Sequence, residues 1–182
     1  MRSDIRFTYE EYQALPETGP RYQLVDGDLI MSPAPSFRHQ DILAELSFLL
    51  GSHVRSSGLG KLLFAPLDVI LSDEDVFQPD IVYISNARRS IIVPEGLRGT
   101  PDLCVEILSP SNKNLDLKTK RLLYARFGLP ELWIVDPDAN TAQVFRLQED
   151  PNQPIGTYSQ NETLTSPSFP GFSLELAKVF SR

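Results

Sequence analysis

The sequence predicts a single domain of the α/β class, with a mixed β-sheet and flanking helices. Two apolar runs, residues 103–108 and 132–135, have the length and composition of buried strands, and a helical pattern separates them. Strand, helix and strand in this order favour a right-handed crossover and a sheet that is partly parallel. The 182 residues, 41% of them hydrophobic, suffice for one substantial core but are too few to favour two domains.

Composition narrows the class of protein. No run of about 18 apolar residues and no charged-then-apolar leader is present, so we expect a cytoplasmic protein without a membrane span. The lone cysteine, Cys104, lies in an apolar run, and we expect a small core residue rather than a reactive thiol. The net charge of −7 argues against a broad basic surface for nucleic acid, although metal-binding carboxylates would account for part of the acidic excess.

The first third of the chain is expected to contain two helices around a hairpin. Thr8, followed by two glutamates, is typical of a helix start. Residues 21–32 contain two short apolar runs on either side of Asp26-Gly27, which predicts a β-hairpin with its turn at that dipeptide. Apolar residues at helical spacing then predict an amphipathic helix over residues 37–54.

The middle of the chain is expected to be mostly strand and loop. Residues 62–71 and 78–84 resemble two strands that an acidic turn at residues 72–75 joins into a second hairpin. Residues 86–101 are rich in glycine and proline and have no sustained period. This composition predicts a loop, which could move over a site.

The second half should continue with alternating elements. Turn and cap residues over 109–114 precede a helix that ends near residue 127. A turn at residues 136–140 then predicts a hairpin that ends at residue 147. Four prolines in mostly polar sequence predict an irregular extension over residues 148–182, with a short helix near 174–180.

Two carboxylates in apolar strands are the strongest indication of chemistry. Glu106 is the only charge in residues 103–108, and an unpaired buried carboxylate costs several kcal/mol. A structural salt bridge is the alternative explanation. Asp80 is a second charge in an apolar run, residues 77–84. Because neighbouring carboxylates repel each other unless a proton, a lysine or a metal intervenes, the pair predicts a shared cation such as Mg²⁺.

The helix after the Glu106 strand offers a lysine to the same site. At about 100° per residue, Lys120 shares a stripe with Asp116 that faces the packed side of the helix. Lys118 and Arg121 point away from that stripe. A surface pair between Asp116 and Lys120 is the alternative. Tyr124, one turn later, is expected to pack, with a hydrogen bond at the site as the alternative.

Further polar residues give weaker indications. His39, near the start of the first long helix, could donate to a phosphate, whereas His53 near its end fits the helix dipole. Asp68 lies in a predicted strand, but its face relative to Asp80 depends on a register that the sequence leaves open. No glycine-rich phosphate loop, paired Cys/His cluster or nucleophile elbow is present, which argues against a kinase, a zinc site or an α/β-hydrolase.

Taken together, these segments resemble the Uma-type endonucleases, a family with the restriction-endonuclease-like PD-(D/E)xK fold. The resemblance covers about residues 8–147. It rests on residues 21–29, Pro35 with His39-Gln40, Gln78-Pro79-Asp80, residues 105–112, and Asp116, Lys120 and Tyr124 ahead of residues 131–136.

The resemblance implies an endonuclease that uses Mg²⁺ or Mn²⁺ to hydrolyse nucleic acid, with DNA favoured over RNA, and that forms a homodimer. It assigns Asp80 and Glu106 to the metal. The usual signature would place a lysine at Leu108, whereas this family supplies it from the following helix, which agrees with Lys120. His39 and Tyr124 are accessory candidates.

Gln23 departs from the family pattern, because glutamate is common at that position near the metal. A neutral amide is a poorer ligand than a carboxylate, so activity could be weakened. The alternative function is therefore a catalytically silent binding module, for nucleic acid or a protein partner, that keeps the nuclease fold. Gln23 is included among the accessory candidates.

Overall fold

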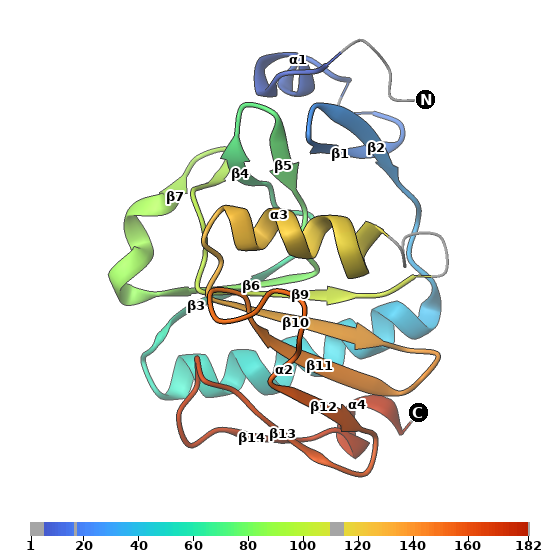
Figure 1. Ribbon diagram of the computed structural model, residues 1–182, viewed down its shortest axis with the longest axis vertical. Coiled ribbons are helices and arrows are strands. Elements are labelled where there is room, and N and C mark those ends of the chain that lie inside the picture. The colour runs from blue at the N-terminus through green and yellow to red at the C-terminus, as the bar shows by residue number, and fades with distance from the viewer. Residues whose placement is uncertain (1–5, 17, 110–114, 182) are drawn as a thin grey trace.

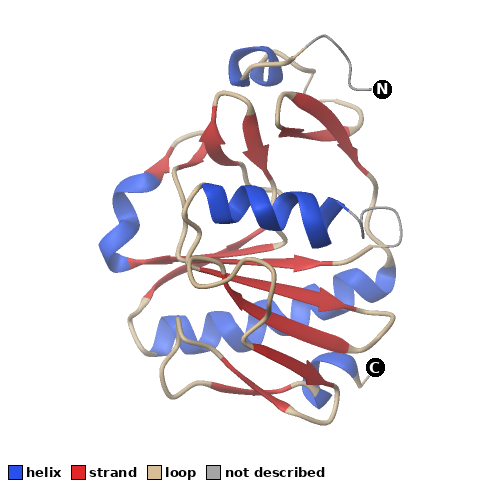
Figure 2. Ribbon diagram, in the orientation of Figure 1, coloured by secondary structure: helices blue, strands red, loops and turns tan. Residues whose placement is uncertain are grey.

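The computed structural model describes residues 6–16, 18–109 and 115–181. Within these ranges the strands form two six-stranded sheets and one two-stranded sheet (Figures 1 and 2). The central sheet contains, from edge to edge, β12 (Gly156–Ser159), β11 (Thr141–Arg146), β10 (Glu131–Asp136), β9 (Leu103–Ile107), β6 (Ile81–Ser85) and β3 (Gly60–Phe64). The N-terminal sheet contains β2 (Asp28–Ser32), β1 (Arg21–Val25), β5 (Asp75–Phe77), β4 (Val69–Ser72), β8 (Gly96–Arg98) and β7 (Ile92–Val93).

The N-terminal elements follow the predicted local signals. Helix α1 (Tyr9–Gln13) begins after Thr8, whose side chain accepts from the backbone of Glu11 while the Glu11 carboxylate accepts from the backbone of Thr8. Strands β1 and β2 form the predicted hairpin. Its two turn residues, Asp26 and Gly27, have φ of 49° and 79°, the left-handed conformation that a tight hairpin turn needs at both positions.

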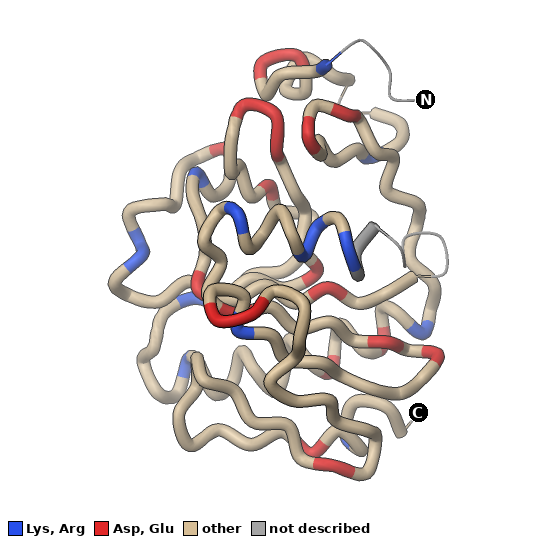
Figure 3. Tube along the Cα trace, in the orientation of Figure 1, with Lys and Arg blue, Asp and Glu red and all other residues tan. Residues whose placement is uncertain are grey.

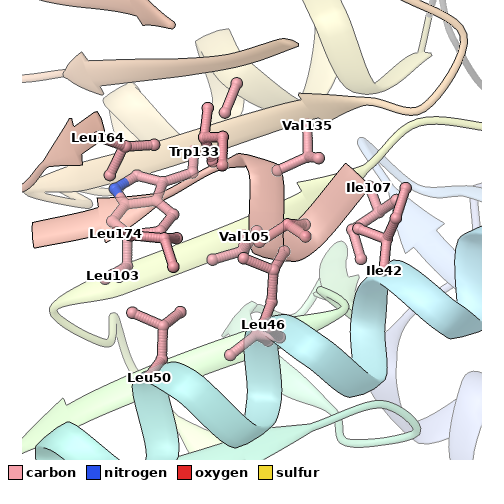
Figure 4. Close-up of a cluster of buried hydrophobic side chains, with 14 of the residues drawn as sticks. Ile42, Leu46, Leu50, Leu103, Val105, Ile107, Trp133, Val135, Leu164 and Leu174 are labelled. Carbon is pink, nitrogen blue, oxygen red and sulfur yellow. The ribbon is translucent and has the colours of Figure 1, made fainter. Parts of the chain in front are cut away.

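Helix α2 (Phe37–Ser56) packs its apolar stripe against one face of the central sheet. Ile42, Leu46 and Leu50 are buried and lie over the β9 residues Val105 and Ile107 (Figure 4). All five residues of β9 are buried, as expected of a central strand. It pairs parallel with β10 and antiparallel with β6, so the predicted mixed sheet is confirmed. None of the helices in the described ranges is long and apolar enough to cross a bilayer.

The prediction of one continuous strand over residues 62–71 is wrong. The chain instead leaves the central sheet after β3 and enters the N-terminal sheet as β4. Pro66 lies between the two strands, and a proline has no backbone N–H to continue a ladder. Pro79 separates β5 from β6 in the same way, so the acidic turn joins β4 to β5, not to β6.

The prediction of an irregular, mobile loop over residues 86–101 is also wrong. A short 3-10 helix, η1 (Asn86–Ile91), leads into β7 and β8, and β8 pairs parallel with β4. Gly96, at φ 148°, lies so close to the backbone carbonyl of Asp68 that a side chain would not fit. Gly96 therefore allows β8 to lie close to the backbone of Asp68, although the composition of residues 86–101 alone indicated a loop.

The C-terminal segment is ordered, which corrects the expectation of an irregular extension. Strand β12 pairs with β11, and β13 (Thr163–Thr165) pairs with β14 (Ser173–Glu175) before helix α4 (Ala177–Phe180). Leu164, Phe169 and Leu174 are buried in the same core as α2. These are isolated apolar residues in mostly polar sequence. A pattern this short does not predict a strand from the sequence alone. The predicted terminal helix is confirmed in shorter form.

A buried carboxylate ties this segment to the central sheet. Glu131, at the start of β10, is 2% exposed and accepts from the Trp133 indole at 2.6 Å. The hydroxyl of Ser166 donates to it at 2.8 Å, and both the backbone N–H and the hydroxyl of Ser168 donate at 2.9 and 2.6 Å. Four donors compensate the buried charge and hold the chain between β13 and β14 against β10.

We expect Glu131→Leu to lower the free energy of unfolding by about 3 kcal/mol, because several buried donors would lose a charged acceptor at once. Ser168→Ala should cost about 1 kcal/mol. Urea unfolding followed by tryptophan fluorescence measures both. Glu149→Leu, at an exposed position, is the matched control. A loss in Glu131→Leu no larger than in this control would contradict the assignment.

Candidate active site

Asp80 and Glu106 come from neighbouring strands of the central sheet. Ile81 pairs with Val105 in the antiparallel register of β6 and β9, so Asp80, one residue earlier, lies opposite Glu106. The Asp80 Oδ2 atom accepts the backbone N–H of Ile107 at 2.7 Å. This bond fixes one carboxylate to the strand that carries the other.

Glu106 is buried and compensated by the helix that follows β9. Lys120, the last residue of the π-helical segment η2 (Leu115–Lys120), places Nζ 3.1 and 3.0 Å from the two carboxylate oxygens. The Tyr124 hydroxyl, on α3 (Arg121–Arg126), donates to Oε1 at 2.7 Å. Lys120 and Glu106 are 2% and 3% exposed, so they form a buried ion pair. The helical periodicity of the sequence predicted that Lys120 faces the packed side of its helix.

These contacts decide between the alternative positions that the sequence left open for Lys120 and Tyr124. Lys120 does not lie at the surface, and the salt bridge considered for Glu106 is present. Tyr124 both hydrogen-bonds at the site and packs edge-on against Phe77, with ring centroids 5.1 Å apart. The favoured expectation that Tyr124 only packs is therefore wrong. The turn over residues 110–114 and the side chain of Asp116 lie outside the described residues.

His39 joins the site from the first turns of α2. Its Nε2 lies 3.2 Å from Asp80 Oδ1, and within the described part of the chain its Nδ1 has no hydrogen-bond partner. Burial by itself lowers the pKa of His39, but the hydrogen bond and the charge of Asp80 outweigh burial and raise the pKa above its usual value. His39 is thus predisposed to carry a proton beside a carboxylate.

Polar side chains from several elements line one pocket of about 110 Å³, which has space for several water molecules. Its lining includes Gln23, His39, Asp80, Glu106 and Lys120. Charged groups of both signs therefore face a small water-sized cavity at the end of the central sheet, where the hairpin of the N-terminal sheet meets α2.

Gln23 reaches this pocket, whereas Asp68 does not. The Gln23 Oε1 atom accepts from the backbone of Gln78 at 3.0 Å, and its Nε2 donates to the Ser32 hydroxyl at 3.0 Å. Asp68 lies outside the pocket lining and accepts from the Tyr12 hydroxyl at 3.0 Å and the Gln78 amide at 2.8 Å. Asp68 therefore links Tyr12 of α1 to Gln78, the residue that follows β5.

Arg21 is a pocket residue that the sequence analysis missed. It lies two residues before Gln23 on β1 and lines the same pocket. Residues i and i+2 of a strand share a face, so this alternation was the signal that could have identified it. A guanidinium is a bidentate donor of the kind that suits a phosphate.

Two residues considered in the sequence analysis lie outside this pocket. Cys104 is fully buried, and burial raises the pKa of its thiol well above the usual value, which agrees with a core residue. His53, near the end of α2, packs its ring 4.6 Å from the ring of Phe172, measured between centroids.

The donor set of the pocket fits a hard divalent ion. Asp80 and Glu106 contribute carboxylate oxygens and Gln23 an amide oxygen, the ligand types that Mg²⁺ and Mn²⁺ take. A carboxylate oxygen has two lone pairs and can keep a hydrogen bond while it binds a metal. Among the described residues no cluster of three His, Cys, Asp or Glu side chains suits a metal. An ion here would take its remaining ligands from water, backbone or substrate, as Mg²⁺ commonly does.

Comparisons with known proteins point in the same direction. The profile of the Uma2 family, described as "Putative restriction endonuclease", matches residues 9–177. A crystal structure described as "a putative nuclease belonging to DUF820" from Anabaena variabilis is similar over 96% of this chain and 98% of its own, with a TM-score of 0.79 and 25% sequence identity. No curated protein matches the chain.

The buried pair of Glu106 and Lys120 predicts strong coupling between two substitutions. We expect Lys120→Met alone to lower the free energy of unfolding by about 3 to 5 kcal/mol, because it leaves a buried carboxylate without its cation. The double variant with Glu106→Gln should lose less than the sum of the single variants. Chemical denaturation of the four proteins tests this, and strict additivity would mean that the pair is not coupled.

Proposed function

Since this chain belongs to the Uma2 family, we propose that it is a divalent-metal-dependent endonuclease that hydrolyses phosphodiester bonds in nucleic acid. The match to the family and to the Anabaena fold confirms the resemblance and the α/β fold class that the sequence predicted. The convergence of Asp80, Glu106 and Lys120 on one pocket supports the proposal most strongly.

Asp80 and Glu106 would hold the ion, either Mg²⁺ or Mn²⁺, which when bound supplies Lewis-acid polarisation of the phosphodiester. The N–H of Ile107 and the hydroxyl of Tyr124 orient these two carboxylates. Both contacts come from the central strand or the helix packed on it. The ligands are therefore held by rigid elements, which keeps them in position without reorganisation.

The remaining pocket side chains would act on the phosphate and the attacking water. The Lys120 ammonium, held by Glu106, orients the water or stabilises negative charge that develops on the phosphate oxygens. His39, which lines the pocket beside Asp80, would donate to a phosphate oxygen, and Arg21 in the same lining would add a second cationic donor. We further propose DNA as the preferred substrate, a homodimer as the working form and the cytoplasm as its location.

A catalytically silent binding module is the second candidate function. The side chain of Gln23, where the related endonucleases commonly have glutamate, is already hydrogen-bonded to Gln78 and Ser32. The described part of the chain contributes two carboxylates to the pocket rather than three. Calorimetric titration with Mn²⁺ separates the candidates: the nuclease requires saturable binding that disappears in an Asp80→Asn, Glu106→Gln double variant.

For cleavage itself, we expect Asp80→Asn, Glu106→Gln and Lys120→Met each to lower the rate by about 100-fold or more, since each removes a charge from the reacting centre. The substrates are plasmid DNA, single-stranded DNA and RNA with Mg²⁺ or Mn²⁺, and excess EDTA should abolish cleavage by the wild type. Thermal unfolding of each variant checks its fold. Asp138→Asn, at an exposed turn, is the matched control. Wild-type rates in all three variants would refute the assignment.

A gain-of-charge variant tests the role of Gln23. We expect Gln23→Glu to tighten Mn²⁺ binding by about tenfold, because a third carboxylate faces the same pocket and affinity for hard cations rises with ligand charge. Calorimetry on the wild type and the variant measures the change. Gln153→Glu, at an exposed position, controls for net charge. Unchanged affinity in Gln23→Glu would show that position 23 does not contact the ion.

A further inference from the structure

A second cavity lies along the outer side of α2 and the edge strand β3. It has a volume of about 690 Å³ and is lined by the second half of α2, by β3 and by Arg89 of η1. Among the described strands β3 pairs only with β6, so its other edge opens onto this cavity. We call this feature the α2–β3 groove.

The charge of the α2–β3 groove is opposite to that of the whole chain. Among the described residues, its lining includes Arg55, Lys61 and Arg89 and no acidic residue, although the chain has 24 acidic and 17 basic residues. None of the three cations forms an ion pair with another described residue. Figure 3 shows the basic and acidic positions along the chain in blue and red. A local positive field of this kind attracts a polyanion.

Exposed aromatic rings lie in the same groove. Phe48 on α2 and Phe64 on β3 both line it and are 69% and 58% exposed. Exposed phenylalanine rings beside unpaired cations are the components of surfaces on which successive bases stack while the backbone follows the positive charge.

The groove adjoins the candidate active site through the same two elements. Leu43 and Ala65 line the pocket, while Ser47, one turn further along α2, and Phe64, adjacent to Ala65, line the groove. A chain that leaves the pocket along α2 and β3 therefore meets Phe48 and Phe64 first and the three cations further on.

We propose that the α2–β3 groove binds a single-stranded segment of nucleic acid next to the bond that the active site cleaves. This inference rests on the proposed function. Unpaired bases expose the faces that Phe48 and Phe64 can stack on, whereas the bases of a duplex are stacked on one another. A second copy of the chain is a poorer occupant, because a two-fold pairing of β3 edges would bring the cations of both copies together.

Binding to fluorescein-labelled 12-nucleotide oligothymidine, measured by anisotropy in EDTA so that cleavage does not interfere, tests the groove directly. We expect the full-length protein to bind this strand more tightly than a duplex of equal length. Phe48→Ser and Phe64→Ser should each weaken binding by about tenfold. Arg55→Gln, Lys61→Gln and Arg89→Gln should each lower the slope of log affinity against log salt concentration by about 0.7.

Matched controls separate the groove from general surface effects. Phe37→Ser removes an 86% exposed ring that does not line the groove, and Lys178→Gln removes a cation on α4; both should bind as the wild type does. Thermal unfolding confirms that each variant folds. Tighter binding of the duplex, or wild-type affinity and salt slope in all groove variants, would overturn the inference.

Two further readouts distinguish failure of the groove from failure of the proposed function. Groove variants that cleave and bind oligothymidine like the wild type would overturn the groove while leaving the nuclease in place. Oligothymidine binding that depends on the groove, without cleavage by the wild type, would support the groove and refute the nuclease. If light scattering shows that Phe64→Ser converts a dimer to a monomer and strand binding is unchanged, the groove is an interface between copies and the inference is overturned.

Discussion

The buried charge of Glu106 is the constraint on which the arrangement of the site depends. A carboxylate in the middle of an apolar strand must be compensated, and here Lys120 and Tyr124 compensate it from the helical segment that follows the strand. The ion pair therefore sets how η2 and α3 dock on the central sheet. Asp80 is fixed to the same strand through the N–H of Ile107. The contacts that dock this helical segment on the sheet are thus the same contacts that position the candidate catalytic residues.

Neighbouring side chains balance the negative charge of the two pocket carboxylates. Lys120 offsets Glu106, and His39, whose pKa is raised above its usual value, lies beside Asp80. Gln23 contributes an oxygen without adding a third negative charge. The neutral amide reduces repulsion in the pocket and also reduces its attraction for a cation. A carboxylate at position 23 would therefore increase both the repulsion within the pocket and the attraction for a cation.

Whole-chain charge is a poor guide to the surfaces of this protein. The net charge of −7 includes carboxylates that are buried and occupied with donors, such as Glu131 and Asp75. The α2–β3 groove, by contrast, is lined by cations and by no acidic residue of the part of the chain that the structure describes. A local field near the pocket decides what approaches it, because screening limits the reach of distant charges to about 10 Å.

Local signals in the sequence were enough for part of the fold and for several of the residues that meet at the candidate site. Asp26-Gly27 predicted its hairpin, the apolar stripe from Ile42 to Leu50 predicted α2, and an isolated charge in an apolar strand identified Glu106, with helical periodicity then selecting Lys120. Contacts between distant segments depended on tertiary structure: the division of the chain between two sheets at Pro66, the parallel pairing of β8 with β4, the packing of the C-terminal segment on Glu131, and the position of His39 beside Asp80. The physical reason is that propensity and periodicity act over a few residues, whereas sheet register and burial are decided by which distant strands pair.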